Sequence, residues 1–229
     1  GKKHKKAKKA KTIKGKRYYD VSTQNKQYRK PAGSGNVSAD ASVQRAGDQL
    51  RAIARNLDEN HDLATGTLDV LVRKTIGTEL KLIPTVRTTT GKPLEKLNRD
   101  LERLWLDWSV FPEVTRELSM AEVQRLVCRS WLRDGEMLAQ YVRGTGSIRP
   151  RTQVAFAIEL LEADYLPFNA DYEQSQSNPN VVAGVEKNQW GEPVAFWIYR
   201  NHPGSISYNE ISDMRMTKRV SAEDMLHLK

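Results

Sequence analysis

The sequence is poor in the residues that metal centres and redox sites use. Cys128 is the single cysteine of the 229 residues, so no internal disulfide can form, which fits a reducing compartment. The four histidines (His4, His61, His202 and His227) are far apart and lack the spacing of metal ligands. We therefore predict no metal site and no cofactor.

Long apolar runs are also missing. No stretch of about 18 apolar residues occurs, so no membrane-spanning helix is predicted and no membrane partner is expected. The basic N-terminus lacks the apolar segment of a secretory signal peptide. Apolar residues make up 38% of the chain and charged residues 28%, so a core is possible but part of the chain must contribute little to it.

The motifs of common enzymes do not occur. Segment 144–146 (Gly-Thr-Gly) lacks the rest of a phosphate-binding P-loop, and there is no G-x-S-x-G nucleophile turn. Cys128 lies inside an amphipathic stretch, which favours a buried structural thiol over a nucleophile. Paired carboxylates such as Asp100 and Glu102 are typical of a solvated helix face. We predict that the protein is not an enzyme and has no catalytic residues.

Positive charge is concentrated at the N-terminus. The formal net charge is +9, but residues 1–30 contain 13 lysines and arginines against one acid, Asp20. The rest of the chain is therefore slightly acidic, and the pI of 9.6 reflects the tail. This distribution argues against a nucleic-acid clamp formed by the whole folded body.

Residues 1–41 are predicted to be a disordered basic arm and linker. A block of like charges repels itself and cannot bury a core, and segment 31–36 has the composition of a linker. The arm either contacts nucleic acid or an acidic partner, or is a solvated terminus. The candidate contact residues are Lys2, Lys3, Lys5, Lys6, Lys8, Lys9, Lys11, Lys14, Lys16 and Arg17.

The region 42–135 is predicted to be mainly helical. Apolar residues at helical spacing indicate a first helix over residues 43–57, and a second begins after Asp62 as N-cap and ends at Gly77. Between this helix and the next, the alternation over 80–86 predicts a short strand, which Pro84 restricts to a sheet edge or a strand end.

Two further helices have clear signals. The third has an apolar stripe from Leu94 to Trp108, with Pro93 in its first turn. The fourth opens with a capping box formed by Ser119 and Glu122 and stops at Gly135. Four tryptophans are candidates for core or subunit packing rather than base stacking, and the last lies at a predicted hairpin tip: Trp105, Trp108, Trp131 and Trp190.

The region 136–229 is predicted to be rich in strands because the apolar period changes from 3.6 to 2. Strands are expected at 136–143, 154–161, 181–187, 194–200 and 224–229. A turn at 188–191 is expected to join the third of these strands to the fourth. Helices followed by strands indicate an α+β fold with a mostly antiparallel sheet. No turn or cap closes the last strand, so we expect this region to be truncated at its C-terminal end.

Four segments follow a known pattern in order. Residues 51–82 contain a helix ending in Arg-Asn, a second helix and an Ile-Gly-x-x-Leu-x-Leu strand. Residues 133–140 turn from a helix through Asp-Gly-Glu into a strand. The third segment comprises 159–166, 182–186 and 191–199, and the fourth is 222–229. Together they resemble the N-terminal part of lambda-like tailed-phage portal proteins, over residues 45–229.

The resemblance implies a structural protein of the virion. Such a subunit forms a homo-oligomeric ring of twelve subunits at one capsid vertex, and region 42–135 would be its wing. The expected partners are terminase, capsid and scaffold, head-completion and tail proteins, and the double-stranded DNA that passes through the channel. Assembly would take place in the host cytoplasm. A mildly acidic body suits a conduit that should not grip sliding DNA.

The alternative function is sequence-independent nucleic-acid binding through the lysine-rich tail. It predicts that deleting residues 1–30 abolishes binding to DNA and that the affinity falls steeply with salt, because released counterions drive such binding. The portal hypothesis predicts instead a ring seen by electron microscopy, at least for the full-length protein.

Overall fold

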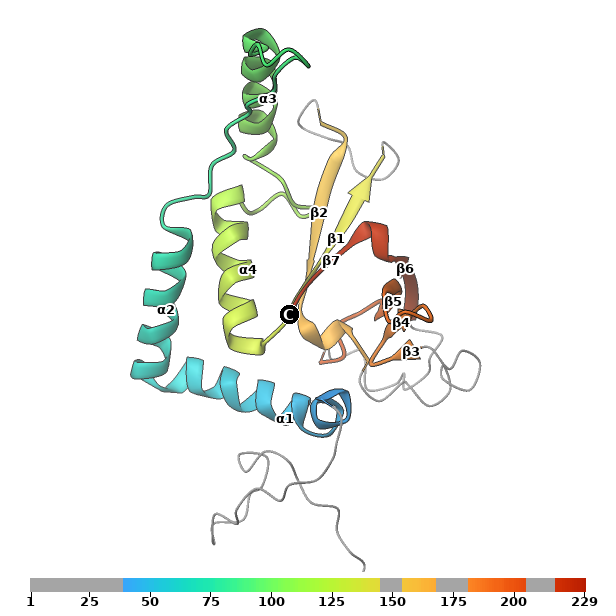
Figure 1. Cartoon of the computed structure of the whole chain (residues 1–229). Helices are drawn as coiled ribbons and strands as arrows, with labels where there is room; N and C mark the ends of the chain where they lie inside the picture. The colour runs from blue at the N-terminus through green and yellow to red at the C-terminus, as the bar shows by residue number, and fades with distance from the viewer. Residues whose placement is uncertain (1–38, 145–153, 168–180, 205–216) are drawn as a thin grey trace, which may run out of the picture. The chain divides into compact units, whose positions relative to one another are not determined.

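The computed structural model describes residues 39–144, 154–167, 181–204 and 217–229 (Figure 1). The predicted contact lysines and Arg17 lie outside these residues. The chain divides into two compact units, 1–50 and 51–229. Helices precede antiparallel sheets, which confirms the α+β prediction. The helices are α1 (Ala39–Asn60), α2 (Asp62–Ile76), α3 (Glu95–Trp108) and α4 (Met120–Asp134). None of them is long and apolar enough to cross a membrane.

Helix α2 begins one residue earlier than the sequence suggested. His61 is its N-cap, so the prediction that Asp62 caps the helix is wrong. Asp62 is instead the first helical residue, where its carboxylate interacts favourably with the positive end of the helix dipole. The helix ends as predicted at Gly77, which has a φ of +65° and donates its N–H to the Arg73 carbonyl.

The predicted strand over 80–86 does not form. Side-chain amides take the place of a partner strand. Gln124 of α4 accepts from Leu80 N at 2.8 Å and donates to Leu80 O at 3.1 Å. Asn98 of α3 binds Val86 in the same way, at 2.8 and 3.2 Å. The backbone polar groups of Leu80 and Val86 are thus satisfied by side chains of two helices.

Helix α3 begins after Leu94, so Pro93 precedes the helix rather than lying in its first turn. Pro93 instead makes an isolated antiparallel bridge with Arg87. At the other end of α3 the indole of Trp108 is buried, donates Nε1–H to the Phe156 carbonyl at 2.7 Å and packs 5.2 Å from the ring of Trp105. This apolar contact holds the end of α3 against the first sheet.

Helix α4 has both ends that its sequence predicted. Ser119 and Glu122 form the capping box, in which Ser119 N donates to Glu122 Oε2 at 2.8 Å. Gly135 ends the helix in the left-handed region, with a φ of +85°. Cys128 is buried on this helix against Val72 and Ile76 of α2, as expected for a structural thiol.

Two antiparallel sheets follow α4. The first has the order β2-β1-β7 and the second β3-β4-β5-β6. The main core lies between them and includes Leu138 and Ile198, which are fully buried. The strands are β1 (Met137–Arg143), β2 (Phe156–Leu161), β3 (Val181–Val182), β4 (Val185–Lys187), β5 (Pro193–Tyr199), β6 (Thr217–Ser221) and β7 (Met225–Leu228). Short 3-10 turns, η2 (Ala163–Tyr165) and η5 (Ala222–Asp224), follow β2 and β6.

The second sheet departs from its prediction in two places. The strand expected over 181–187 is broken into β3 and β4 by Ala183 and Gly184, both at positive φ. A Cβ at Gly184 would lie 2.8 Å from Pro167 Cδ, so only glycine fits here. Strand β6 was not predicted because its sequence, Thr-Lys-Arg-Val-Ser, has no apolar alternation.

Glu113 organises the connection between α3 and α4 from a buried position. Its carboxylate accepts hydrogen bonds from Thr115 N at 2.7 Å, Glu117 N at 2.6 Å and Leu118 N at 3.1 Å, and from the Thr115 hydroxyl. Burial alone would raise the pKa of Glu113, but these hydrogen bonds outweigh it and hold the pKa below its usual value.

We expect Glu113→Ala to lower the free energy of unfolding by about 3 kcal/mol, because three backbone N–H groups lose their acceptor. Glu117→Ala, at an exposed position of the same connection, should change it by less than about 0.5 kcal/mol. Urea denaturation measures both. Equal effects of the two substitutions would contradict a structural role for the Glu113 carboxylate.

Candidate subunit interface

Asp134, the last residue of α4, is the centre of a network of arginines and carboxylates. Its carboxylate is almost fully buried and lies between two guanidinium groups. Arg55 of α1 donates through Nη2 at 2.8 Å and Nε at 3.2 Å, and Arg133 donates through Nε at 2.8 Å. We call Asp134 and the ion pairs joined to it the Asp134 network.

The charges in the Asp134 network are mutually stabilised. Burial alone would raise the pKa of Asp134, but hydrogen bonds from Arg133 and Arg55 outweigh it, so the pKa is lowered. The hydrogen bond to Asp134 raises the pKa of Arg55 above its ordinary value, against the effect of burial. Asp134 therefore stays ionised at neutral pH although water is excluded from it.

The Asp134 network extends to the strands of the first sheet. Arg51 of α1 is buried and pairs through Nη1 with Glu136 at 3.0 Å and through Nε with Asp164 of η2 at 3.3 Å. Glu136 also contacts Nε2 of His227 in β7 at 2.9 Å. These pairs fix the C-terminal half of α1 against the start of β1 and the end of β2.

A second arginine of α4 ties α1 to α2. Arg129 binds Asp58 of α1 with its Nη2 2.5 Å from Oδ1 and also pairs with Asp69 of α2. Burial opposes the charge of Arg129, but the hydrogen bonds that Arg129 donates to the two carboxylates raise its pKa. Arg133 lies 3.6 Å from Asp58, so this cluster is continuous with the Asp134 network.

Three side chains of the network could in principle ligate a metal. Potential ligand atoms of Glu162, Asp164 and His202 lie within 4.8 Å of one another. Arg55 is already paired with Glu162 and Asp164, so its positive charge opposes a cation there. His202 Nδ1 accepts from Gly204 N at 3.0 Å, which places the proton of a neutral imidazole on Nε2, the atom that faces the carboxylates. The geometry favours ion pairing over metal binding.

The four predicted tryptophans occupy two kinds of environment. Trp105 and Trp108 pack in the apolar core at the end of α3, which is one of the two environments considered for them. Trp131 on α4 is 40% exposed. Trp190, between β4 and β5, is 83% exposed. The packing of these side chains against another subunit therefore remains a prediction, with Trp131 and Trp190 the accessible candidates.

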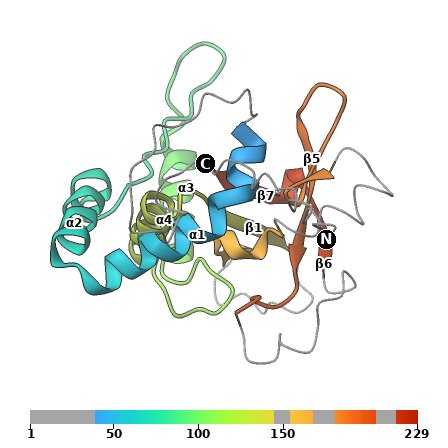
Figure 2. The ribbon, with the colours of Figure 1, turned by 90° about the horizontal axis from the view of Figure 1, so that it is seen from below.

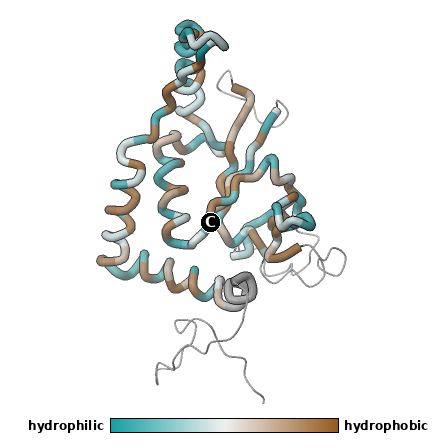
Figure 3. The backbone as a smooth tube through the Cα atoms, viewed as in Figure 1, coloured by the Kyte–Doolittle hydropathy of each residue, from teal (hydrophilic) through white to brown (hydrophobic). Residues whose placement is uncertain are grey.

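A broad set of exposed apolar side chains covers α2, α3 and the segment between them. Figure 3 shows apolar positions recurring along α2. Exposed apolar side chains in such numbers are candidates for contact with other molecules. The members of this set, which we call the apolar flank, are Leu63, Val70, Leu71, Leu80, Leu82, Ile83, Val86, Leu94, Leu97, Leu101 and Leu106.

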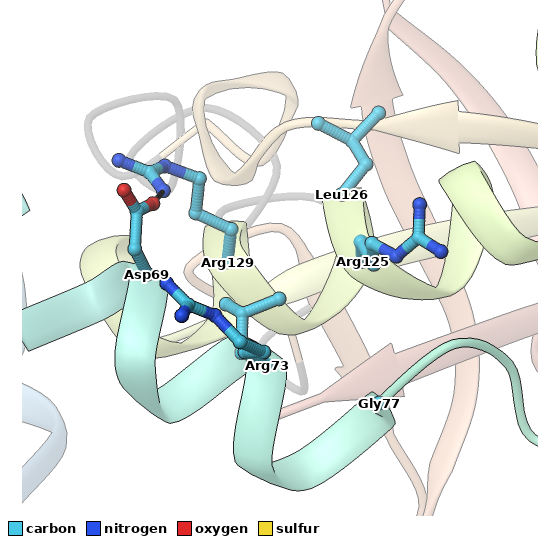
Figure 4. Close-up of a pocket in the computed structure, with 7 residues that line it drawn as sticks. Asp69, Arg73, Gly77, Arg125, Leu126 and Arg129 are labelled. Carbon is cyan, nitrogen blue, oxygen red and sulfur yellow. Dashed lines mark hydrogen bonds and ion pairs between the residues drawn. The ribbon is translucent and has the colours of Figure 1, made fainter. Parts of the chain in front are cut away.

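An open pocket lies beside the apolar flank, between α2 and α4 (Figure 4). Its volume is about 420 Å³. The pocket is lined by charged and apolar residues. They are Asp69, Val72, Arg73, Gly77, Arg125, Leu126 and Arg129. Asp69 and Arg129 pair at one side of the pocket, and Arg125 donates to the Thr78 carbonyl at 2.6 Å at the other.

Comparison with known proteins identifies the family of this chain. A sequence model described as "Phage portal protein, lambda family" matches residues 25–229, which is most of the chain. The chain belongs to the lambda family of phage portal proteins. It is also 26% identical over 169 residues to a "Probable portal protein" of Halomonas phage phiHAP-1. That match covers 72% of this chain and 32% of the relative, so the chain spans about a third of the relative's length.

The Asp134 network of this portal chain was missed by the sequence analysis, although a local signal exists. Arg51 and Arg55 on α1, and Arg129 and Arg133 on α4, are each four residues apart and so form arginine rows on one helix face. Such rows can equally be solvated. Most of the carboxylates that pair with these arginines come from distant parts of the chain, so the pairing depends on the tertiary fold.

We expect Asp134→Asn to lower the free energy of unfolding of the portal chain by about 3 kcal/mol, because Arg55 and Arg133 lose a buried counter-charge. Asp100→Asn is the control: the side chain of Asp100 is half-exposed and its one ion pair, with Arg103, is long at 4.0 Å, so its loss should cost less than about 1 kcal/mol. Chemical denaturation of both variants gives the comparison.

The effect of Asp134→Asn should depend on pH. Because the folded state lowers the pKa of Asp134, its stabilisation is complete above about pH 4, the usual range for aspartate, and is lost as the pH falls through the lowered pKa. The difference between wild type and variant should therefore shrink in acid. A difference that grows as the pH falls would contradict this assignment.

Proposed function

We propose that this chain is a subunit of a phage portal ring, through which DNA is packaged into the capsid. The apolar flank over α2, α3 and the segment between them carries the proposal, because a chain that exposes this many large apolar residues is suited to contact a neighbour. Membership of the lambda portal family supports a ring as the form that this contact takes.

The finer roles are part of the same proposal. A ring at the capsid vertex would contact capsid and scaffold during assembly in the host cytoplasm, bind terminase while DNA enters, and then bind head-completion and tail proteins in the virion. The number of subunits is proposed to be twelve. No catalytic step is assigned to the chain. Among the described residues, the buried Asp134, Arg51 and Asp58 are held in ion pairs of the Asp134 network.

The Asp134 network supports this function in a specific way. A packaging ring must keep its shape while DNA moves through it, so each subunit needs a frame that does not deform. The charge pairs that join α1 to α4, η2 and the start of β1 provide such a frame. The basic tail favours the alternative function, nucleic-acid binding, only through its charge.

Sedimentation velocity and negative-stain electron microscopy of the purified chain test the proposal. We expect particles much larger than the 26.1 kDa monomer, with ring-shaped end views. Deleting residues 1–30 should leave them intact, since the apolar flank lies in the folded body. A protein that stays monomeric at every concentration, or that hydrolyses ATP or cleaves DNA, would contradict the proposed function.

A further inference from the structure

The tip of the β4–β5 hairpin holds Trp190 outward on a rigid turn. Asn188 Oδ1 accepts from Trp190 N at 2.9 Å and from Glu192 N at 3.0 Å, and Asn188 Nδ2 donates to Glu192 Oε2 at 2.9 Å. Gly191 supplies the positive φ that the turn needs. The side chain of Trp190 is 83% exposed, so it contributes little to the stability of the fold. The backbone of Trp190 is nevertheless held by the turn, which lowers the entropy lost when the side chain binds a partner.

The pocket between α2 and α4 is also preformed. Arg129 is held by Asp58 and Asp69, and Arg125 by the carbonyl of Thr78, so two guanidinium groups on its wall have fixed positions. Its volume of about 420 Å³ falls within the roughly 300–1,000 Å³ of pockets that hold small organic molecules. An indole is smaller than such ligands and would fit.

Helix α2, which forms one wall of the pocket, and the β4–β5 hairpin lie on opposite sides of the unit formed by residues 51–229, as two views turned by 90° show (Figures 1 and 2). They therefore cannot meet within one chain. Two different patches on opposite flanks are what a head-to-tail contact requires, and repeating such a contact closes a ring when the rotation allows.

We propose that Trp190 of one copy of this chain inserts into the α2–α4 pocket of the next copy. The inference rests on the proposed function, because it specifies the contact between neighbours in the ring. The chemistry of the two parts is complementary. The electron-rich face of an indole attracts guanidinium groups such as those of Arg73, Arg125 and Arg129, while Val72 and Leu126 receive its apolar edge.

Sedimentation velocity of matched variants tests the contact. Trp190→Ala should weaken self-association by about 30-fold, as for a buried tryptophan at the centre of an interface. Trp190→Phe keeps an aromatic face and should lose much less. Gln189→Ala, at an exposed neighbouring position on the same tip, should match wild type. Because these side chains are exposed, circular dichroism and thermal unfolding should be unchanged.

The pocket side has its own pair of variants. Leu126→Glu places a carboxylate among the arginines, where it would occupy the pocket, and should weaken association as much as Trp190→Ala. Leu132→Glu is the control, since Leu132 lies on the same helix, is 37% exposed against 41% for Leu126, and does not line the pocket. It should associate like wild type.

Mixing the two defective variants gives the sharpest result. Trp190→Ala retains a pocket and Leu126→Glu retains the tryptophan, so one productive contact is possible and the mixture should form heterodimers but no rings. If Trp190→Ala associates as strongly as wild type, or if the mixture stays monomeric, the inference is overturned and the portal function still stands. A wild-type chain that never associates would overturn both.

Discussion

Asp134 imposes the constraint on which the second unit depends. A carboxylate in a water-excluded position is stable only if its charge is matched, so Arg55 and Arg133 must both reach it. Arg55 comes from α1, whereas Asp134 lies where α4 turns through Gly135 into β1. Satisfying one charge therefore fixes a helix from the start of the unit against the corner that leads into its sheets.

From this fixed corner the unit presents two different flanks. Helix α2 is held by the pairs of Arg129 with Asp58 and Asp69, and it carries part of the apolar flank and one wall of the pocket. The second sheet is held by the main core and carries Trp190 at its hairpin tip. A rigid body with unlike flanks is suited to head-to-tail association, whereas a two-fold dimer needs one patch that matches itself.

Most local features of the fold could be predicted from the sequence because they depend on neighbouring residues, although the N-cap of α2 and the place of Pro93 were wrong. The stripe of α3, the capping box of Ser119, the glycine at 77 and the turn before Gly191 are all confirmed. The order of four short segments was enough to predict the portal family. Features that depend on distant contacts were missed or wrong: the partners of Asp134, the amide that binds Leu80 in place of a strand, and the close approach to Pro167 that requires Gly184.

We propose that this portal chain assembles head to tail through its two flanks. An electron cryo-microscopy reconstruction of the assembled protein would show the contact itself. We expect a closed ring in which the β4–β5 hairpin of each subunit meets α2 and α4 of the next, with density for Trp190 beside Arg73 and Arg125. A two-fold dimer, or a ring whose hairpins all face solvent, would contradict it.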